Sequence, residues 1–206
     1  MKIVIVRSLA ALGIATALIL SFNSTPAVAQ EVGFEIAEVE VFPDTAPKTP
    51  NYDVSSSGMN IRDMAKKSWF RMVVEYETMP EWIDELTFDY YVLMRPPEVE
   101  GQQEAPQPVV FHKKIDYVYI YEGDEHFSEV FMHPNSLRRF YDGDILEWAV
   151  LVSYKGREIA GESSRQGQGR WWEQFSVREG VLRNRHETPF AFINIEQYEE
   201  IKPAAR

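Results

Sequence analysis

The chain has 206 residues and a formal net charge of −11 at neutral pH, and 45% of its residues are hydrophobic and 26% charged. These fractions are those of a globular chain and exclude wholesale disorder. So acidic a chain lacks the cationic surface that nucleic-acid binding requires. It has no cysteine, which excludes disulfides, cysteine-ligated zinc, iron–sulfur clusters, thiol nucleophiles and lipid-modified cysteine anchors.

The first 29 residues have the three parts of a secretory signal peptide. The start carries Lys2 and Arg7, residues 9–20 form an apolar run, and residues 27–29 (Ala-Val-Ala) are the small residues that signal peptidase recognises. The apolar run is short for a membrane helix, which needs about 20 residues; an uncleaved N-terminal anchor is the alternative. We expect export to the periplasm or cell envelope, and a mature single domain of residues 30–206 with no membrane span.

The mature chain begins with segments that alternate apolar and polar residues, the pattern of half-buried strands. Residues 32–42 alternate with an irregularity near Ala37, which indicates a bulge. Residues 69–78 and 86–94 each place apolar side chains at every second position. Met79-Pro80-Glu81 lies between them and predicts a turn, so we expect the two segments to form a hairpin.

Later segments continue the pattern. The proline-rich residues 96–108 predict a long exposed loop. Residues 134–141 predict one short helical turn, with Pro134 at its start and Gly143 just past its end. Residues 144–154 are almost continuously apolar, which indicates a strand buried on both faces. The remaining strands are expected at 109–111, 115–121 (with Tyr117, Tyr119 and Tyr121 on one face), 128–132, 157–163 after a tight turn at Lys155-Gly156, 171–177 and 190–195.

This succession of roughly eight to ten short strands predicts an all-β fold. No segment supplies the long amphipathic helices that parallel βαβ units require. We therefore expect an immunoglobulin-like antiparallel β-sandwich with long loops and one short helical turn. A closed barrel is the alternative.

No motif indicates catalysis, a cofactor or a metal site. The histidines (His112, His126, His133 and His186) lack the spacing of metal ligands, and we interpret them as exposed loop residues. The acidic segments 122–124 and 142–144 carry oxygen ligands that suit calcium, but Asp and Gly are also ordinary turn residues. There is no nucleophile elbow and no phosphate-binding loop. We expect a protein that is not an enzyme and that has no cofactor and no metal.

Two adjacent tryptophans give the candidate contact surface. On a strand, Trp171 and Trp172 would point to opposite faces, so at most one would lie in a core. The other would be exposed and available to a protein or a sugar ring, unless the loop at 164–169 or the N-terminal segment covers it. The candidate contact residues are Trp171, Trp172 and Phe175.

Three stretches of the chain resemble a known family. They are residues 82–93 (WIDELTFDYYVL), residues 130–140 (VFMHP leading to LRRF) and residues 181–191 (VLRNRHETPFA). Over most of residues 68–195 the chain is similar to exported pilus-like β-sandwich proteins that are found beside type IV pilus-type assembly genes in verrucomicrobial bacteria. The resemblance implies an immunoglobulin-like fold, an envelope location and no known enzymatic role. It brings no catalytic or ligand residues.

The leading hypothesis is an exported structural or interaction protein of the cell envelope, resembling accessory proteins of pilus-like assemblies. It would bind envelope or pilus-like proteins, or a second copy of itself, through its surface or an edge strand, whose unpaired backbone groups accept a partner strand. The strand around residues 171–177 is the candidate for this contact. The alternative is a glycan-binding module that uses exposed Trp and Tyr side chains. A third hypothesis, a hydrolase, would need a cleft that gathers ionisable groups.

Overall fold

The computed structural model describes residues 33–42, 47–50, 67–98, 100–101 and 104–203. The chain divides into two units, Met1–Glu31 and Val32–Arg206, and every element described below belongs to the second. The expected signal peptide, residues 1–29, lies outside the described residues and stays a prediction. Among the described residues, no helix has the length and apolar character needed to cross a membrane.

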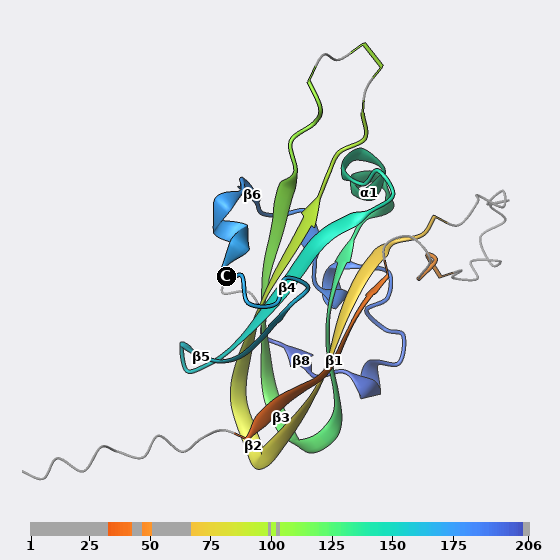
Figure 1. Cartoon of the computed structure of the whole chain (residues 1–206). Helices are drawn as coiled ribbons and strands as arrows, with labels where there is room; N and C mark the ends of the chain where they lie inside the picture. Colours follow the sequence, from red (N-terminus) through yellow and green to blue (C-terminus); the bar gives the residue numbers. More distant parts are fainter. Residues whose placement is uncertain (1–32, 43–46, 51–66, 99, 102–103, 204–206) are drawn as a thin grey trace, which may run out of the picture. The chain divides into compact units, whose positions relative to one another are not determined.

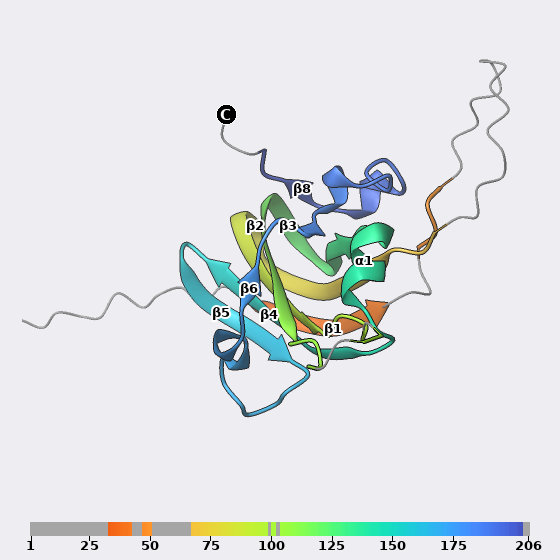
Figure 2. The ribbon, with the colours of Figure 1, turned by 90° about the horizontal axis from the view of Figure 1, so that it is seen from above.

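The described part of the chain consists mainly of antiparallel strands, which confirms the all-β prediction (Figure 1). All eight strands belong to one sheet, which curls around its own core instead of splitting into two separate sheets (Figure 2). The main path is β5-β4-β2-β3-β6, with β1 paired to β2, and β7 and β8 paired to β3. The strands are β1 (Phe34–Phe42), β2 (Phe70–Met94), β3 (Val109–Met132), β4 (Ile145–Tyr154), β5 (Arg157–Ser163), β6 (Val177–Arg178), β7 (Leu182–Arg183) and β8 (Glu200–Ile201).

Two long strands, β2 and β3, form the frame of this sheet. The predicted turn at Met79-Pro80-Glu81 is wrong, because β2 runs through it without a break. From Thr78 to Trp82 the chain advances four residues while its partner advances only from Gly123 to Tyr121. The surplus residues form a bulge, which is where a strand tolerates a proline that cannot donate to the ladder. The bulge divides β2 into a first half paired with β1 and a second half paired with β4.

The facing strand has its own irregularities. The acidic segment 122–124, expected as a turn, lies inside β3 opposite the bulge of β2. The tyrosines of β3 do not share one face: Tyr117 is buried, whereas Tyr119 and Tyr121 are exposed. The cause is the left-handed backbone of Tyr119, whose φ of 59° interrupts the alternation of the strand.

Several other predictions are confirmed. The helix α1 spans Pro134–Phe140, and the His133 side chain caps it by accepting a hydrogen bond from the Asn135 amide at 3.1 Å. The β4–β5 turn at Lys155-Gly156 has positive φ at both residues, as two-residue hairpin turns require. β1 carries the expected irregularity, a register shift between Ile36 and Glu38. The described residues of the 96–108 segment form an extended connection without helix or strand.

The burial of β4 on both faces is also confirmed. Val150 lies in the main core, which the curled sheet encloses with side chains of β2 and β3. Its neighbour Ala149 points the other way, into a second cluster with Trp171 and Trp172. The sheet is therefore covered on its outer side at this point, which explains why the strand is almost continuously apolar.

The predicted strand at residues 171–177 is wrong. Trp171–Gln174 forms a 3₁₀ turn, in which successive side chains are about 120° apart and do not alternate between two faces. Both tryptophan rings are therefore buried, with 0% exposure for Trp171 and 5% for Trp172. The Trp171 indole nitrogen donates a hydrogen bond to Ser163 Oγ at 2.9 Å, and the Arg165 guanidinium covers the ring, so the loop at 164–169 buries it.

The predicted strand at residues 190–195 is also wrong. This segment consists of turns that lead into another 3₁₀ turn, Ile195–Gln197. Asn194 adopts a left-handed backbone with a φ of 50°, which no regular strand contains. The last strand is β8, a few residues further on.

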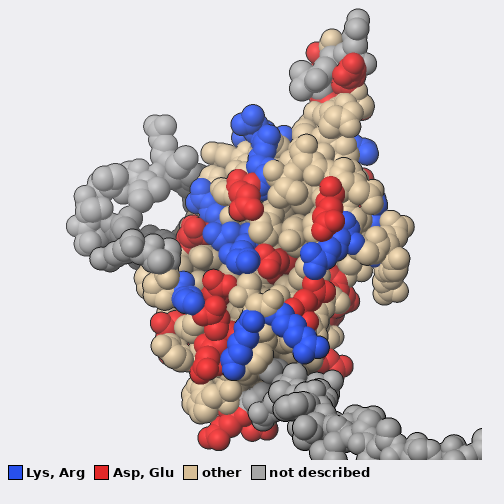
Figure 3. Space-filling view, turned by 90° about the vertical axis from the view of Figure 1, so that its left-hand side faces the viewer, with Lys and Arg blue, Asp and Glu red and all other residues tan. Residues whose placement is uncertain are grey.

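Charged side chains of both signs are interspersed over one face of the surface (Figure 3). Several form ion pairs, such as Arg170 with Glu158 at 2.8 Å and Lys113 with Glu187 at 2.8 Å. Exposed pairs of this kind contribute only about 0–1 kcal/mol each. The stability of the fold therefore depends on its apolar clusters and on its buried polar contacts.

The buried and exposed tryptophans give a test of the fold. We expect Trp171→Ala to lower the free energy of unfolding by about 3–5 kcal/mol, because it leaves a cavity in the second cluster. Trp82→Ala should change it by less than about 0.5 kcal/mol, because the Trp82 side chain is 62% exposed. Urea denaturation of both variants measures the difference, and equal losses would contradict the burial of Trp171.

Candidate functional site

The outer face of the β2–β3 pair is covered by a segment that we call the C-terminal arm, residues 184–199. The arm begins after β7, which pairs with the end of β3, and it ends before β8, which pairs with the middle of β3. In Figure 2 it lies on the side of β2 and β3 opposite β1, β4 and β5. Its Phe190 ring stacks on Phe131 of β3 with ring centroids 5.3 Å apart and meets the edge of Trp69 at 5.5 Å.

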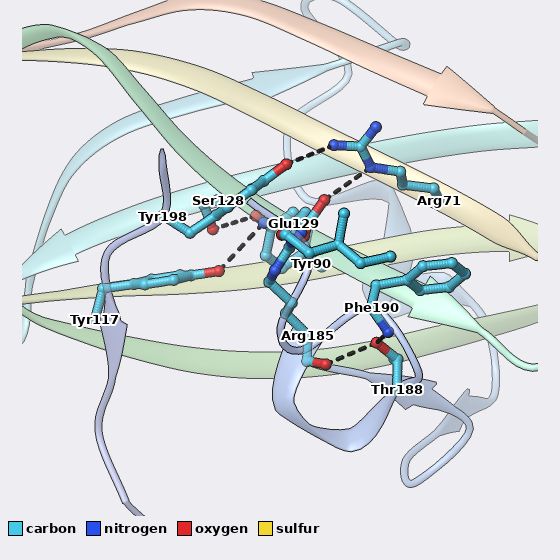
Figure 4. Close-up of polar contacts among 10 residues, drawn as sticks. Arg71, Tyr90, Tyr117, Ser128, Glu129, Arg185, Thr188, Phe190 and Tyr198 are labelled. Atoms are coloured by element: carbon cyan, nitrogen blue, oxygen red, sulfur yellow. Dashed lines mark hydrogen bonds and ion pairs between the residues drawn. The ribbon is translucent and has the colours of Figure 1, made fainter. Parts of the chain in front are cut away.

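The arm buries a carboxylate on β3. Val130 and Met132 face the main core, so the alternate residues Glu129 and Phe131 face the arm. Glu129 is 0% exposed. A buried carboxylate is tolerated only when it is paired and hydrogen-bonded. One oxygen accepts from Arg71 Nε at 2.7 Å, and the other is paired with Arg185 of the arm (Figure 4).

Arg185 connects this buried acid to the rest of the arm. Its guanidinium carbon lies 3.6 Å from the centre of the Tyr198 ring, a cation–π contact. It also donates to the backbone oxygen of Ile193, while its buried Nε has no hydrogen-bond partner among the described residues. Arg71 donates to the Tyr198 hydroxyl at 3.1 Å. Glu129, Arg71, Arg185 and Tyr198 thus tie two strands and both halves of the arm together, and we call them the anchor.

Local capping positions Arg185 for this contact. The Asn184 side chain accepts from the Glu187 amide at 3.1 Å, and the Glu187 carboxylate accepts from the Asn184 amide at 2.8 Å. This capping box fixes the 3₁₀ turn Arg185–Glu187. Thr188 then donates to the Arg185 carbonyl at 2.7 Å. The stretch 181–191, which carries part of the family resemblance, therefore serves to shape and attach the arm.

A cavity of about 320 Å³ lies between the arm, β3 and β8. Its lining includes the rings of Tyr117 and Tyr198 and the aliphatic side chains of Ala191, Ile195 and Ile201. Four charged or histidine side chains also line it: Arg185, His186, Glu199 and Glu200. Two of them are already held in pairs, Arg185 with Glu129 and Glu199 with His126 at 2.7 Å. These two groups serve to hold the arm on the sheet.

From the sequence we expected all four histidines to be exposed loop residues, but the structure places them in different surroundings. His126 is 2% exposed, and its Nε2 lies 3.2 Å from Thr78 Oγ1 while its Nδ1 contacts Glu199 of the arm. His133 caps α1. His186 is exposed at the rim of the cavity. Within the described ranges, no group of three or more His, Asp and Glu side chains is placed to hold a metal ion.

His112 lies between two carboxylates. Its Nε2 is 2.9 Å from Asp89 and its Nδ1 is 2.7 Å from Glu179. The hydrogen bond to Asp89 raises the pKa of His112 above its usual value, with a further rise from Glu179 and an opposing effect of partial burial. The ring also stacks on Tyr91, which stacks on Trp172. Trp172, one of the expected contact residues, therefore lies at the buried end of an aromatic stack.

Among the described residues, exposed large apolar side chains occur in groups at two places, apart from the single Val177. The first, which we call the arm patch, consists of Phe192, Ile193 and Ile195. The second, which we call the bend patch, consists of Met79, Trp82, Tyr119 and Tyr121, where β2 and β3 carry their irregularities. Neither was expected as a contact surface from the sequence, because Phe192 and Ile193 lie in a predicted strand and Trp82 follows a predicted hairpin turn.

The edge-strand surface also differs from the expectation. Around residues 171–177, the only strand among the described residues is β6, two residues that run parallel to β3. Within the described ranges, β1 pairs only with β2 and β5 only with β4. The outer edges of β1 and β5 are therefore the long edges that this sheet presents.

The anchor predicts a large effect of one substitution. Glu129→Ala should lower the free energy of unfolding by about 3–5 kcal/mol, because it leaves Arg185 buried without its counter-charge. The control is Glu158→Ala, which removes the exposed pair with Arg170 and should cost less than about 1 kcal/mol. Chemical denaturation compares the two, and similar losses would show that Glu129 is not the residue that holds the arm.

His112 predicts a pH-dependent stability. Because the pKa of His112 is raised in the folded state, its contribution is fully present below the unfolded value of about 6.5 and is lost as the pH rises through the folded value. His112→Gln should therefore destabilise the protein more at about pH 5.5 than at about pH 9. Thermal unfolding across this range measures it, and Glu179→Gln should reduce the same dependence. A constant difference between wild type and His112→Gln would contradict the pairing.

Comparison with known proteins adds two findings, while no curated protein matches the chain. The fold is similar to the crystal structure of a protein from Akkermansia muciniphila, a verrucomicrobe, with a TM-score of 0.70, 22% identity, and coverage of 84% of this chain and 94% of that chain. At this identity the similarity shows the fold alone. The model of one protein family matches residues 25–205. Because this match extends over more than half of the chain, the protein belongs to that family.

Proposed function

We propose that this protein is exported to the cell envelope, is not an enzyme, and acts by binding another protein as an accessory of a pilus-like assembly. The signal-peptide pattern of residues 1–29 supports export. The resemblance of residues 68–195 to exported pilus-like proteins supports the pilus-like context, and the fold shared with a protein of a verrucomicrobe agrees with it. The single observation that carries the contact role is the arm patch.

The arm patch has the properties of a preformed contact surface. Phe192 is 80% exposed, and Ile193 and Ile195 flank it on the same arm. An exposed aromatic ring among aliphatic side chains is typical of the centre of protein interfaces. The backbone beneath it is held in place, because Arg185 donates to the Ile193 carbonyl and Phe190 stacks on Phe131. A surface fixed in this way loses less conformational entropy when a partner binds.

The sheet edges are weaker candidates for the same role. β1 carries exposed carboxylates at Glu35, Glu38 and Glu40, and charged side chains on an edge strand oppose pairing with another chain. β5 is a short strand, and short edge strands offer few backbone groups to a partner strand. The three residues of the arm patch are uncharged. A partner can therefore place an apolar side chain beside Phe192 without contacting a charge of the patch itself.

The non-enzymatic part of the proposal rests on how the cavity residues are used. Arg185 and Glu199 hold the arm through Glu129 and His126, so a reaction that moved their charges would also weaken the attachment of the arm. His186 and Glu200, which are exposed, are the acidic or basic lining residues outside these pairs among the described residues.

Crosslinking in cells tests this proposal. A photoreactive amino acid at position 192 should give adducts with an envelope protein, and cell fractionation should find the protein outside the cytoplasm. The same amino acid at Val177, an exposed apolar residue away from the arm, is the control and should give few adducts. With the photoreactive amino acid at position 195 instead, the additional substitution Phe192→Asp should abolish the adducts, whereas Val177→Asp should not. Adducts at position 177 but not at 192 would refute the arm patch as the contact surface.

A further inference from the structure

The bend patch is a second exposed apolar surface, and its charge surroundings identify a ligand class. Met79 and Trp82 come from the bulge of β2, and Tyr119 and Tyr121 come from the facing stretch of β3. All four side chains are more than half exposed. Large aromatic side chains left exposed together are uncommon on a soluble domain and indicate an interaction site.

The aromatic rings are held at an angle to each other. Trp82 pairs with Tyr121 across the two strands, with ring centroids 6.4 Å apart and an angle of 63° between the ring planes. The other side of Tyr121 meets the buried ring of His126 edge-on at 5.3 Å. Tyr119, which has a left-handed backbone, is also exposed and lies two residues before Tyr121 on β3. The patch therefore presents ring faces in more than one direction rather than one flat platform.

Carboxylates flank these rings along both strands. Segments 77–84 and 119–125 contain six acidic residues and no lysine or arginine: Glu77, Glu81, Asp84, Glu122, Asp124 and Glu125. All six are exposed, and none of them forms an ion pair among the described residues. One of them, Asp84, has a weak electrostatic interaction with Lys155. Acidic side chains are visible at the lower end of the molecule in Figure 3, the end at which β2 and β3 bend in Figure 1.

We propose that the bend patch binds a lysine- and arginine-rich segment of another protein. A cation is attracted to the face of a Trp or Tyr ring, and the unpaired carboxylates add attraction of the same sign. Angled rings can contact one cationic side chain from two sides, whereas a sugar stacks on a flat ring face. The uncompensated negative charge gives no advantage to a neutral sugar. The occupant favoured by both the rings and the charges is therefore a basic peptide segment.

This inference does not rest on the arm patch. The two surfaces share no residue, so variants of one leave the other intact. If the arm patch fails its crosslinking test, the bend patch can still bind a basic segment, and the reverse also holds.

The test uses a synthetic twelve-residue peptide of repeating Lys-Arg-Gly and the purified protein, with binding measured by calorimetry at low and high salt. We expect binding that weakens as salt increases, since salt screens exposed charges. Trp82→Ala should weaken binding about tenfold, because it removes the larger ring of the pair. Phe192→Ala, which alters only the arm patch, should leave the affinity unchanged.

A charge-matched pair of double variants separates a specific site from general acidity. Glu81→Gln with Glu122→Gln removes two charges at the bend, and Glu38→Gln with Glu40→Gln removes two exposed charges on β1. The first should weaken binding about tenfold and the second less than about twofold. Equal weakening would overturn the proposal, because the peptide would then respond to the net charge of −11 alone. No peptide binding, together with sugar binding on a glycan array that Trp82→Ala abolishes, would overturn it in favour of a glycan site.

Discussion

The burial of the Glu129 carboxylate under the C-terminal arm is the constraint on which the outer half of this structure depends. The strand geometry of β3 places Glu129 on the face away from the main core, where water would solvate it if the arm were absent. Once the arm covers it, the charge must be paired, and Arg71 and Arg185 do this from opposite sides. The arm can therefore dock in only the arrangement that brings Arg185 to Glu129.

This interaction specifies position more than it adds stability. Removing two charges from water costs about as much as their attraction returns, so a buried ion pair gives little net stabilisation over an apolar contact. The pair specifies the position of the arm because any arrangement that separates the partners leaves a buried charge uncompensated, which is strongly destabilising. Phe190, stacked on Phe131 and Trp69, supplies apolar burial on one side of the anchor, and the capping box of Asn184 and Glu187 shapes the entry of the arm.

The sequence predicted those parts of the fold that local rules determine. The alternation in β1, the continuous apolar run of β4, the turn at Lys155-Gly156 and the start of α1 at Pro134 depend on neighbouring residues, and all are confirmed. The turn predicted at Pro80 was wrong, because a proline that ends an ordinary strand is accepted at a bulge, and a bulge depends on how the partner strand pairs. The strand predicted at Trp171 and Trp172 was wrong, because a 3₁₀ turn and a strand can have the same short aromatic sequence.

The functional surfaces escaped prediction because exposure is a tertiary property. Phe192 and Trp82 have the composition of core residues, and only the packing of the arm and the bend shows that they lie outside. The anchor did leave a signal: Glu129 is a single charge just before the apolar run Val130–Met132, and Arg185 lies in a stretch that resembles the family. These two residues indicate a buried ion pair only when it is known that the chain returns to β3 after Arg185 has been placed over Glu129.

The anchor and the bend patch are connected through the end of the arm. His126, which supports the exposed ring of Tyr121, is paired with Glu199 at the arm's end, next to Tyr198 of the anchor. The orientation of the bend aromatics therefore depends on the arm being seated. Detaching the arm would expose Glu129 to water and would also remove the carboxylate that holds His126 behind Tyr121. The arm patch and the bend patch thus have separate residues but a common support, since both need the arm closed over β3.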